Sequence, residues 1–275
     1  MKNKVFIIAE AGVNHNGKIS LAKKLIEKAS DAKADFIKFQ FFNPDNITTK
    51  WLKTANYQKK NTNAKTQYEL LKKLYLPYKK LKLLEKFSKK RKIKFMLSIF
   101  DHENVKKINL FNIKYIKIPS GEINNHLLLK KIAKLKKKII LSTGGSELKE
   151  IREALITLKK NKLHISKISL LHCVSNYPSS FKSTNLKSII SLKNKFKCDV
   201  GLSDHSLGYS IPLAAVSLGA KIIEKHLTLS KKMKGPDHKA SLEPKEFKKM
   251  VEEIKNIEIA LGNKNKKIQK EEKEN

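Results

Sequence analysis

Residues 201–208, GLSDHSLG, place Ser203, Asp204 and His205 side by side. These are the three residue types of a hydrolase triad. Consecutive side chains of an extended strand point in opposite directions, so Ser203 and His205 would share one face and Asp204 the other. We therefore expect Ser203 and His205 to act as ligands in one site, rather than as a nucleophile and its base. The sequence leaves the role of Asp204 open and favours a structural one.

A second histidine, His226, lies in another apolar run, IIEKHLT at 222–228. If the two runs form neighbouring strands, about 4.8 Å apart, His205 and His226 could reach one divalent ion. Either histidine alone would more often be structural. Two histidines without a cysteine indicate an open site that water and substrate oxygen complete. Mn²⁺ or Mg²⁺ suits such a site, and Zn²⁺ would also be tolerated.

Two lysines, Lys38 and Lys117, stand inside the apolar runs FIKFQ and YIKIP. A strand interior is a costly place for an unpaired charge, so two such lysines facing one space would make an anion site. Ser98 lies at the end of another run. Four further hydroxyl groups lie just after runs, at Ser120, Ser142, Ser175 and Ser203. Any one serine could be a helix cap. Together with Gly121, Gly144 and Gly145, the set favours phosphate binding.

Carboxylates complete the candidate site. Glu10 ends the first apolar run, Glu122 follows the KIPSG stretch, and Asp237 lies in GPDH at 235–238. Beside a cation-rich pocket these groups could act as acids or bases, or bind hydroxyl groups. GPDH by itself could equally be an ordinary turn.

The elements that must position these residues are short apolar runs, each followed by a polar turn and a helical pattern. The runs are VFIIAEA (5–11), FIKFQFF (36–42), IKFMLSIF (93–100), YIKIPSG (115–121), KIILSTG (138–144), ISLLHCVS (168–175), DVGLSDH (199–205) and IIEKHLT (222–228). Eight strand–helix units predict the α/β class and a (β/α)8 TIM barrel, whose site lies at the C-terminal strand ends. A doubly wound sheet is the alternative, but no run opens a GxGxxG turn.

The barrel is expected to span residues 1–262, and residues 263–275 to form a charged, disordered tail. Residues 43–66 form a long insertion after the second run and contain the single tryptophan, Trp51. A loop of this length is often a lid or a binding loop, although a plain surface loop is almost as common.

The composition restricts the partners and the compartment. The 275 residues carry 60 Lys and Arg against 25 Asp and Glu, a net charge of +35. The excess is nearly all lysine, is spread along the chain and accompanies no RNA-binding or zinc-finger signature, so we predict no nucleic-acid partner. Cys173 and Cys198 form no CxxC pair, which suits a reducing compartment. No run approaches a membrane span of roughly 20 apolar residues, and we predict a cytoplasmic protein.

The motifs AEAGVNHNG, KFQ, KIPSGE, LSTGG, HCVSNYP, GLSDHS, EKHLT and GPDH, in this order, resemble the sialic acid synthase (N-acetylneuraminate synthase) family. Its members condense phosphoenolpyruvate with an N-acylated aldose into a nonulosonic acid. The resemblance implies that phosphoenolpyruvate is held by Lys38, Ser98, Lys117, Ser120, Ser142, Ser175 and Ser203. It implies that His205 and His226 hold the divalent metal, and that the sugar and the reacting centre are faced by Glu10, Glu122, Tyr177 and Asp237.

Family members continue into an antifreeze-like domain that adds an arginine to a partner subunit's site. Here ALGNKNKKIQKEEKEN resembles the beginning of the linker to it. We therefore expect this chain to act alone, as a homodimer, or with that domain supplied by another chain. N-acetylmannosamine, its 6-phosphate and diacetamido sugars remain possible acceptors. The alternatives are a related phosphoenolpyruvate-dependent aldol synthase making a shorter sugar acid, and a catalytically impaired barrel kept as a binding subunit.

Overall fold

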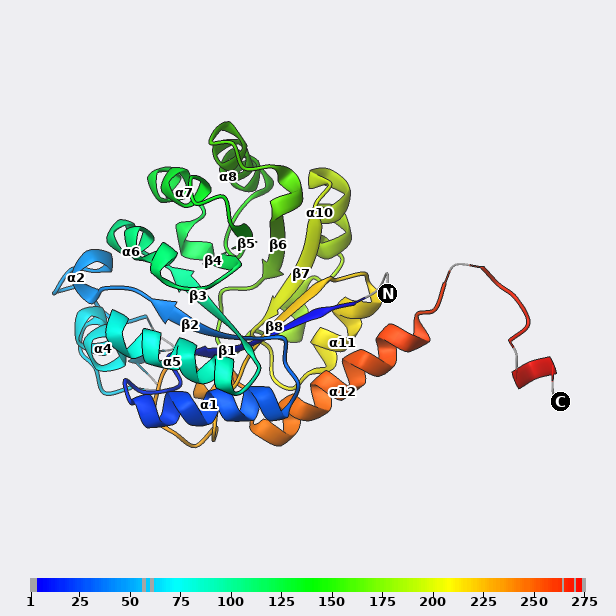
Figure 1. The fold of residues 1–275 in the computed structure, drawn as a ribbon, viewed down its shortest axis with the longest axis horizontal. Helices are drawn as coiled ribbons and strands as arrows, with labels where there is room; N and C mark the ends of the chain where they lie inside the picture. The colour runs from blue at the N-terminus through cyan, green and yellow to red at the C-terminus, as the bar shows by residue number, and fades with distance from the viewer. Residues whose placement is uncertain (1–3, 56–57, 60–61, 264, 270, 274–275) are drawn as a thin grey trace.

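Eight parallel strands close into a barrel in chain order, and helices surround them (Figure 1). The computed structural model describes residues 4–55, 58–59, 62–263, 265–269 and 271–273. The strands are β1 (Phe6–Gly12), β2 (Phe36–Phe41), β3 (Lys94–Ile99), β4 (Tyr115–Ile118), β5 (Lys138–Ser142), β6 (Ile168–Cys173), β7 (Asp199–Asp204) and β8 (Ile222–His226). The predicted (β/α)8 barrel is therefore confirmed.

The helices follow the strands as the sequence predicted. They are α1 (Ile19–Asp31), α2 (Pro44–Ile47), α4 (Gln67–Leu74), α5 (Tyr78–Lys90), α6 (His102–Lys107), α7 (His126–Ala133), α8 (Leu148–Lys160), α9 (Phe181–Thr184), α10 (Ser188–Phe196), α11 (Ser210–Ser217) and α12 (Pro244–Ala260). Short 3-10 helices are η1 (Ile108–Leu110), η2 (Ser120–Glu122), η3 (Ile165–Lys167), η4 (His238–Ala240) and η5 (Glu271–Lys273). Most strands end before the predicted runs do, because the last residues of those runs leave the sheet to form the loops of the barrel mouth.

The inward-facing side chains change from apolar to polar along each strand. An apolar layer inside the barrel consists of Ile8, Phe36, Met96, Ile140, Leu171 and Ile222. Two positions further along the same strands stand Glu10, Lys38, Ser98, Ser142, Cys173 and Glu224, all of which line a cavity. Because side chains two residues apart share a face of a strand, the polar layer lies directly above the apolar one, at the C-terminal end.

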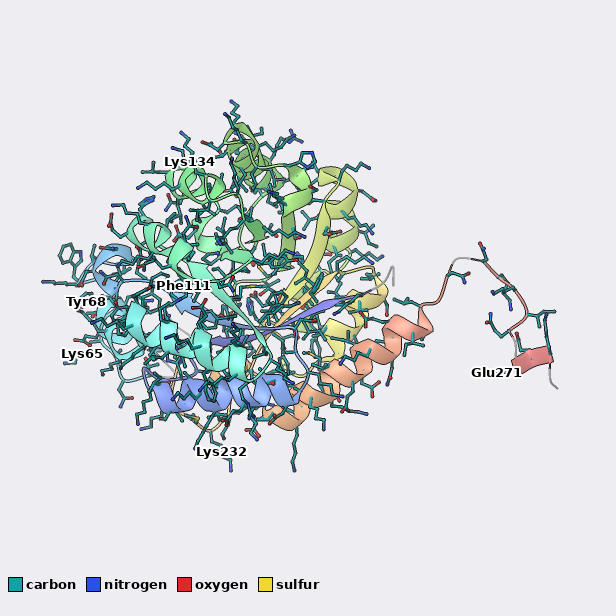
Figure 2. All side chains as sticks on the ribbon, in the orientation of Figure 1. Lys65, Tyr68, Phe111, Lys134, Lys232 and Glu271 are labelled. Atoms are coloured by element: carbon teal, nitrogen blue, oxygen red, sulfur yellow. The ribbon has the colours of Figure 1, made fainter. Side chains whose placement is uncertain are left out.

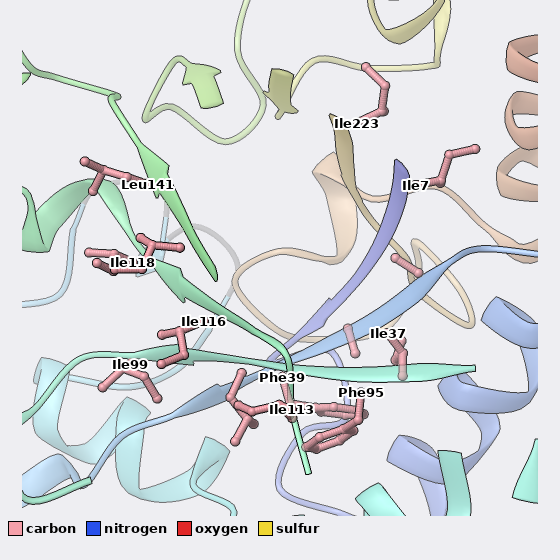
Figure 3. Packing of buried hydrophobic residues seen from close by; sticks show 14 of the residues in the cluster. Ile7, Ile37, Phe39, Phe95, Ile99, Ile113, Ile116, Ile118, Leu141 and Ile223 are labelled. Carbon is pink, nitrogen blue, oxygen red and sulfur yellow. The ribbon is translucent and has the colours of Figure 1, made fainter. Parts of the chain in front are cut away.

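The main hydrophobic core lies between the outer face of the barrel and the helices, and Figure 3 shows part of it. Within it Phe39 stacks on Phe95, with ring centroids 5.6 Å apart. The lysine excess lies largely outside this core, and side chains such as Lys134 and Lys232 project from the surface in Figure 2. Among the described residues, no helix combines the length and the apolar character that crossing a membrane requires.

The insertion at 43–66 packs at the barrel mouth together with α4. Gln67 donates its backbone N–H to the carbonyl oxygen of Leu52 at 2.8 Å, and Thr66 caps α4 through the N–H of Glu69. Residues 56–57 and 60–61 of the insertion lie outside the described residues.

At the other end of the chain, the described tail residues beyond α12 are exposed and lead away from the barrel (Figure 1). Residues 264, 270 and 274–275 of the predicted tail lie outside the described residues. The helix α12 ends at Ala260, close to the barrel boundary that the sequence predicted at residue 262.

Candidate active site

A cavity of about 600 Å³ opens at the C-terminal end of the barrel. Every residue predicted for the site lines it: Glu10, Lys38, Ser98, Lys117, Ser120, Glu122, Ser142, Ser175, Tyr177, Ser203, His205, His226 and Asp237. They come from the ends of all eight strands or from the loops that follow. Barrel closure therefore brings together residues from nearly the whole length of the chain.

Four buried charged side chains lie close together in the polar layer. Lys38 Nζ is 2.7 Å from Glu10 Oε2 and 3.6 Å from Glu224 Oε2, and Lys117 Nζ is 3.8 Å from Glu224 Oε1. The carboxylates of Glu10 and Glu224 outweigh burial and raise the pKa of Lys38. For Lys117 burial outweighs the nearby carboxylates and lowers the pKa. Burial raises the pKa of Glu10 to about 7, whereas the two lysines, acting against burial, lower the pKa of Glu224.

Glu224 is a site residue that the sequence analysis did not assign. Besides pairing with both lysines, it accepts a hydrogen bond from Ser203 Oγ at 2.9 Å. It thereby links the lysines of β2 and β4 to the serine of β7. The signal that could have found it is the alternation along β8, which puts Glu224 on the same face as His226.

Serine hydroxyls converge on the lysines. Lys38 Nζ donates to Ser98 Oγ at 2.9 Å, and Lys117 Nζ donates to Ser142 Oγ at 2.7 Å. Both serines are buried at the cavity wall. Ser98 and Ser142 therefore contact the cations of the site, and the helix-cap alternative does not describe them.

Two further serines approach the backbone at Gly144. Ser120 Oγ accepts a hydrogen bond from the Gly144 N–H at 3.0 Å. A Cβ atom at position 144 would lie 2.4 Å from Ser175 Oγ and 3.0 Å from Ser120 Oγ. Only glycine leaves room for both hydroxyls here, which supports the sequence-based grouping of these serines with the neighbouring glycine.

His205 directly follows β7 and His226 ends the neighbouring strand β8, with ring centroids 5.7 Å apart. His205 Nδ1 donates to the Val174 carbonyl oxygen at 2.7 Å, because a carbonyl can only accept, so Nε2 of the neutral ring carries no proton. Nε2 lies 3.4 Å from Ser203 Oγ, which donates its own hydrogen to Glu224. His226 Nδ1 is buried without a hydrogen-bond partner among the described residues and lies 3.9 Å from Asp237 Oδ2. Burial lowers the pKa of both imidazoles, that of His205 to about 4, so both are neutral.

This arrangement fits a divalent ion. Neutral imidazole nitrogen is the form that binds a metal, and both rings have one nitrogen without a donor role. The described part of the chain contains no group of three or more His, Cys, Asp or Glu side chains arranged around one metal position. A metal held by His205 and His226 would therefore take further ligands from water or substrate.

Asp204 lies on the opposite face of β7 and does not line the cavity. Its carboxylate forms a fully buried ion pair with Lys225 at 2.5 Å and accepts hydrogen bonds from the N–H and hydroxyl of Ser206. Lys225 also donates to the Ser206 carbonyl oxygen. Asp204 thus stabilises the loop that follows β7, and a Ser203–His205–Asp204 triad is excluded by geometry.

Lys225→Met is expected to lower the free energy of unfolding by about 3–5 kcal/mol, because it leaves the Asp204 carboxylate buried without its partner. Urea-induced unfolding measures this change. Adding Asp204→Asn should recover part of the loss. The control is Lys248→Met on α12, whose ion pair with Glu252 is exposed and should contribute at most about 1 kcal/mol. Equal effects of the two lysine variants would contradict the structural role.

The remaining predicted residues stand around the histidines and at the mouth. The Tyr177 ring lies 4.0 Å from that of His205. Glu122 is about half-buried and accepts a hydrogen bond from Asn125 Nδ2 at 2.8 Å; burial raises its pKa. Burial also raises the pKa of Asp237 to about 7. Asp237 can therefore take up or release a proton near neutrality.

Not every polar residue at a strand end reaches the cavity. Asn14 donates to the Leu227 carbonyl and to Ser241 Oγ, both at 2.9 Å, and so joins two loops. Asp101 caps α6 by accepting the N–H of Asn104 at 2.8 Å. These two residues stabilise the loops that carry the site.

The second feature that the sequence did not assign is a largely apolar stretch of the cavity lining. The insertion and α4 contribute Ile47, Thr48, Leu52, Lys53, Ala55, Gln58, Gln67, Leu70, Leu71 and Leu74 to the cavity. Of the two alternatives considered for residues 43–66, a binding loop and a plain surface loop, this position favours the binding loop.

The comparisons with known proteins agree with this geometry. Residues 25–266 match the sequence pattern of the NeuB family. The chain belongs to the NeuB family. Its resemblance to sialic acid synthases is thereby confirmed.

Several relatives show how far the NeuB-family likeness extends. The chain is 53% identical over 273 residues to N,N'-diacetyllegionaminic acid synthase of Campylobacter jejuni, covering 99% of this chain and 82% of that protein. It is 44% identical to the enzyme of the same name from Legionella pneumophila, over 95% of this chain and 74% of that protein. The crystal structure of N-acetylneuraminic acid (sialic acid) synthetase from Leptospira borgpetersenii matches with a TM-score of 0.86 and 39% identity, over 99% of this chain and 90% of that one.

Proposed function

We propose that this chain condenses phosphoenolpyruvate with an N-acylated aldose, forming a nonulosonic acid and releasing phosphate. The observation that carries the proposal is that an anion site and a histidine pair share one cavity. Lys38 and Lys117, with their serine partners, suit the phosphate and carboxylate of phosphoenolpyruvate. His205 and His226 line the same cavity, at the ends of β7 and β8. Membership of a family of sugar-acid synthases supports the same reaction.

Different residues of the cavity are proposed to bind phosphoenolpyruvate and the acceptor. Phosphoenolpyruvate is held by Lys38, Ser98, Lys117, Ser120, Ser142, Ser175 and Ser203. Glu10 and Asp237 bind acceptor hydroxyl groups, and the Tyr177 ring positions the acceptor beside His205. The lysine ammonium groups neutralise charge that grows on the leaving phosphate, in a site that already holds them in place.

In the proposed reaction, the methylene carbon of phosphoenolpyruvate forms a bond to the aldehyde carbon, and the aldehyde oxygen takes up a proton. Water adds to the enol carbon, which carries positive charge at this stage. The bond from this carbon to the phosphate oxygen then breaks, which leaves a 2-keto acid and free phosphate. Glu122, at the cavity mouth with a raised pKa, is proposed to move the proton of the water or of the hydroxyl.

A divalent ion, Mn²⁺ or Mg²⁺, is proposed to bind between His205 and His226, with Asp237 near by. When bound, it would supply an electrophilic partner for the aldehyde oxygen. The Nδ1 atom of His226, which is buried without a hydrogen-bond partner among the described residues, supports this assignment. A cytoplasmic location and a homodimer are further parts of the proposal.

The experiment that tests the proposed function measures release of inorganic phosphate from phosphoenolpyruvate with several N-acylated aldoses. It is run with Mn²⁺, with Mg²⁺ and with a chelator, and with the chain alone or mixed with an antifreeze-like domain. We expect phosphate release to depend on the metal. Mass spectrometry should detect one nonulosonic acid molecule for each phosphate released. Absence of turnover in every mixture would overturn the proposal.

A further inference from the structure

The end of the barrel opposite to the cavity is closed by three aromatic rings. Phe6, Phe36 and Tyr115 are the first residues of β1, β2 and β4, and their ring centroids lie between 5.3 and 6.5 Å apart. Lys94 Nζ lies 5.3 Å from the ring centroid of Phe36, and Lys138 Nζ lies 5.5 Å from that of Tyr115. The strand register pairs each lysine with its ring. Two cations therefore lie over the aromatic residues that close the barrel.

Further lysines surround these aromatic rings. At this end of the barrel each helix leads back into a strand, and five of these connections contain an exposed lysine with a φ between 52° and 66°: Lys33, Lys92, Lys136, Lys162 and Lys197. Glycine is the usual residue in this left-handed conformation. A lysine there places a positive charge beside the negative end of the helix dipole. We call these five residues, together with Lys94 and Lys138, the basic face.

The positive charge of the basic face is not balanced by acidic side chains. None of its lysines forms an ion pair with a described carboxylate. Acids at this end of the barrel are largely engaged with other cations, since Asp35 pairs with Lys4 at 3.2 Å and Asp31 with Arg91 at 3.4 Å. A strong positive potential therefore remains over this end, and it attracts anions.

We propose that the basic face binds the phosphate groups of an anionic phospholipid bilayer, so that the chain associates peripherally with a membrane surface. Cations on all sides of the barrel axis match a two-dimensional array of phosphates. Each lysine close to such a surface adds to the attraction, and lysine binds phosphate as a point charge without a fixed orientation. Because the cavity opens at the opposite end, it stays accessible to small molecules while the chain is bound.

A nucleic acid fits the basic face less well than a bilayer does. A single strand follows one line and stacks its bases on exposed rings. Here the Phe36 ring is 4% exposed, and Lys94 lies over it. Arg91, an arginine at this end, is already paired with Asp31, so its guanidinium is engaged. These contacts favour a flat anionic surface as the partner.

The test measures co-sedimentation of the protein with vesicles of phosphatidylcholine alone and of phosphatidylcholine mixed with phosphatidylglycerol. At about 0.1 M salt, where charges act over roughly 10 Å, the wild type should bind only the mixed vesicles, and about 1 M salt should release it. The triple variant Lys92→Gln/Lys94→Gln/Lys136→Gln should lower the partition coefficient onto mixed vesicles by roughly 100-fold.

The matched control is Lys232→Gln/Lys234→Gln/Lys239→Gln. It removes the same charge from exposed lysines in the loop after β8, which also carries Asp237 of the cavity lining, at the opposite end of the barrel. This control should bind mixed vesicles nearly as the wild type does. Urea-induced unfolding of both triple variants shows whether each one is folded.

A second variant, Lys33→Gln/Lys162→Gln/Lys197→Gln, keeps both lysines over the rings and should show a similar loss. Equal losses in the basic-face variants and the control would overturn the inference, because the overall charge of +35 would then explain the binding. Equal binding of the wild type to both kinds of vesicle would also overturn it. So would tighter binding to duplex DNA than to mixed vesicles at equal phosphate concentration, lost in the basic-face variants.

Discussion

His226→Ala is expected to lower kcat/KM for the condensation by on the order of 1,000-fold and to weaken Mn²⁺ binding by at least about tenfold. A metal ion acting on a carbonyl oxygen contributes several kcal/mol, and each 1.4 kcal/mol is a factor of ten. The Nδ1 atom of His226 is buried without another partner among the described residues, so its loss removes a ligand and breaks no observed hydrogen bond there. Calorimetric titration with Mn²⁺ and the phosphate-release assay measure the two effects separately.

The control for this substitution is His164→Ala, in an exposed position at the start of η3, which should affect neither measurement. Unfolding in urea should be recorded for both variants, because His226 is buried and its loss leaves a space. If His226→Ala folded normally and bound Mn²⁺ as the wild type does, the ion would have to bind elsewhere, and the assignment of the histidine pair would be wrong.

Lys117→Met is expected to raise the dissociation constant of phosphoenolpyruvate by roughly 10- to 150-fold. A hydrogen bond to a charged group contributes about 1.5–3 kcal/mol, and the ammonium group lies where the anion is proposed to bind. Methionine keeps most of the side-chain volume. In this variant Lys38 Nζ still lies 3.6 Å from Glu224 Oε2, so the Glu224 carboxylate is not left without a cation. Calorimetric titration with phosphoenolpyruvate, with metal omitted, measures the change.

The matched control is Lys134→Met, because Lys134 is an exposed lysine remote from the cavity lining (Figure 2). It removes the same charge from the same highly basic chain, so it separates a local contact from the general field of the +35 protein. Equal weakening by both variants would show that the overall charge attracts phosphoenolpyruvate, and that Lys117 is not a ligand.

The barrel and most of the polar lining of the cavity could be predicted because the signals are local. A strand such as FIKFQF shows its two faces by alternation, and the polar residue at its end shows where the mouth lies. The same alternation separated Asp204 from Ser203 and His205. Glu224 was missed although the pattern contained it, because its partners, Lys38 and Lys117, come from other strands.

By itself, the sequence determined the barrel, the family and the strand ends that line the cavity, since these follow from residue types and their order along the chain. Only the tertiary structure decided the partners: Asp204 with Lys225, Glu224 between two lysines, and the insertion with α4 as part of the cavity lining. These contacts join segments far apart in the sequence. They depend on strand register and barrel closure, which no single segment specifies.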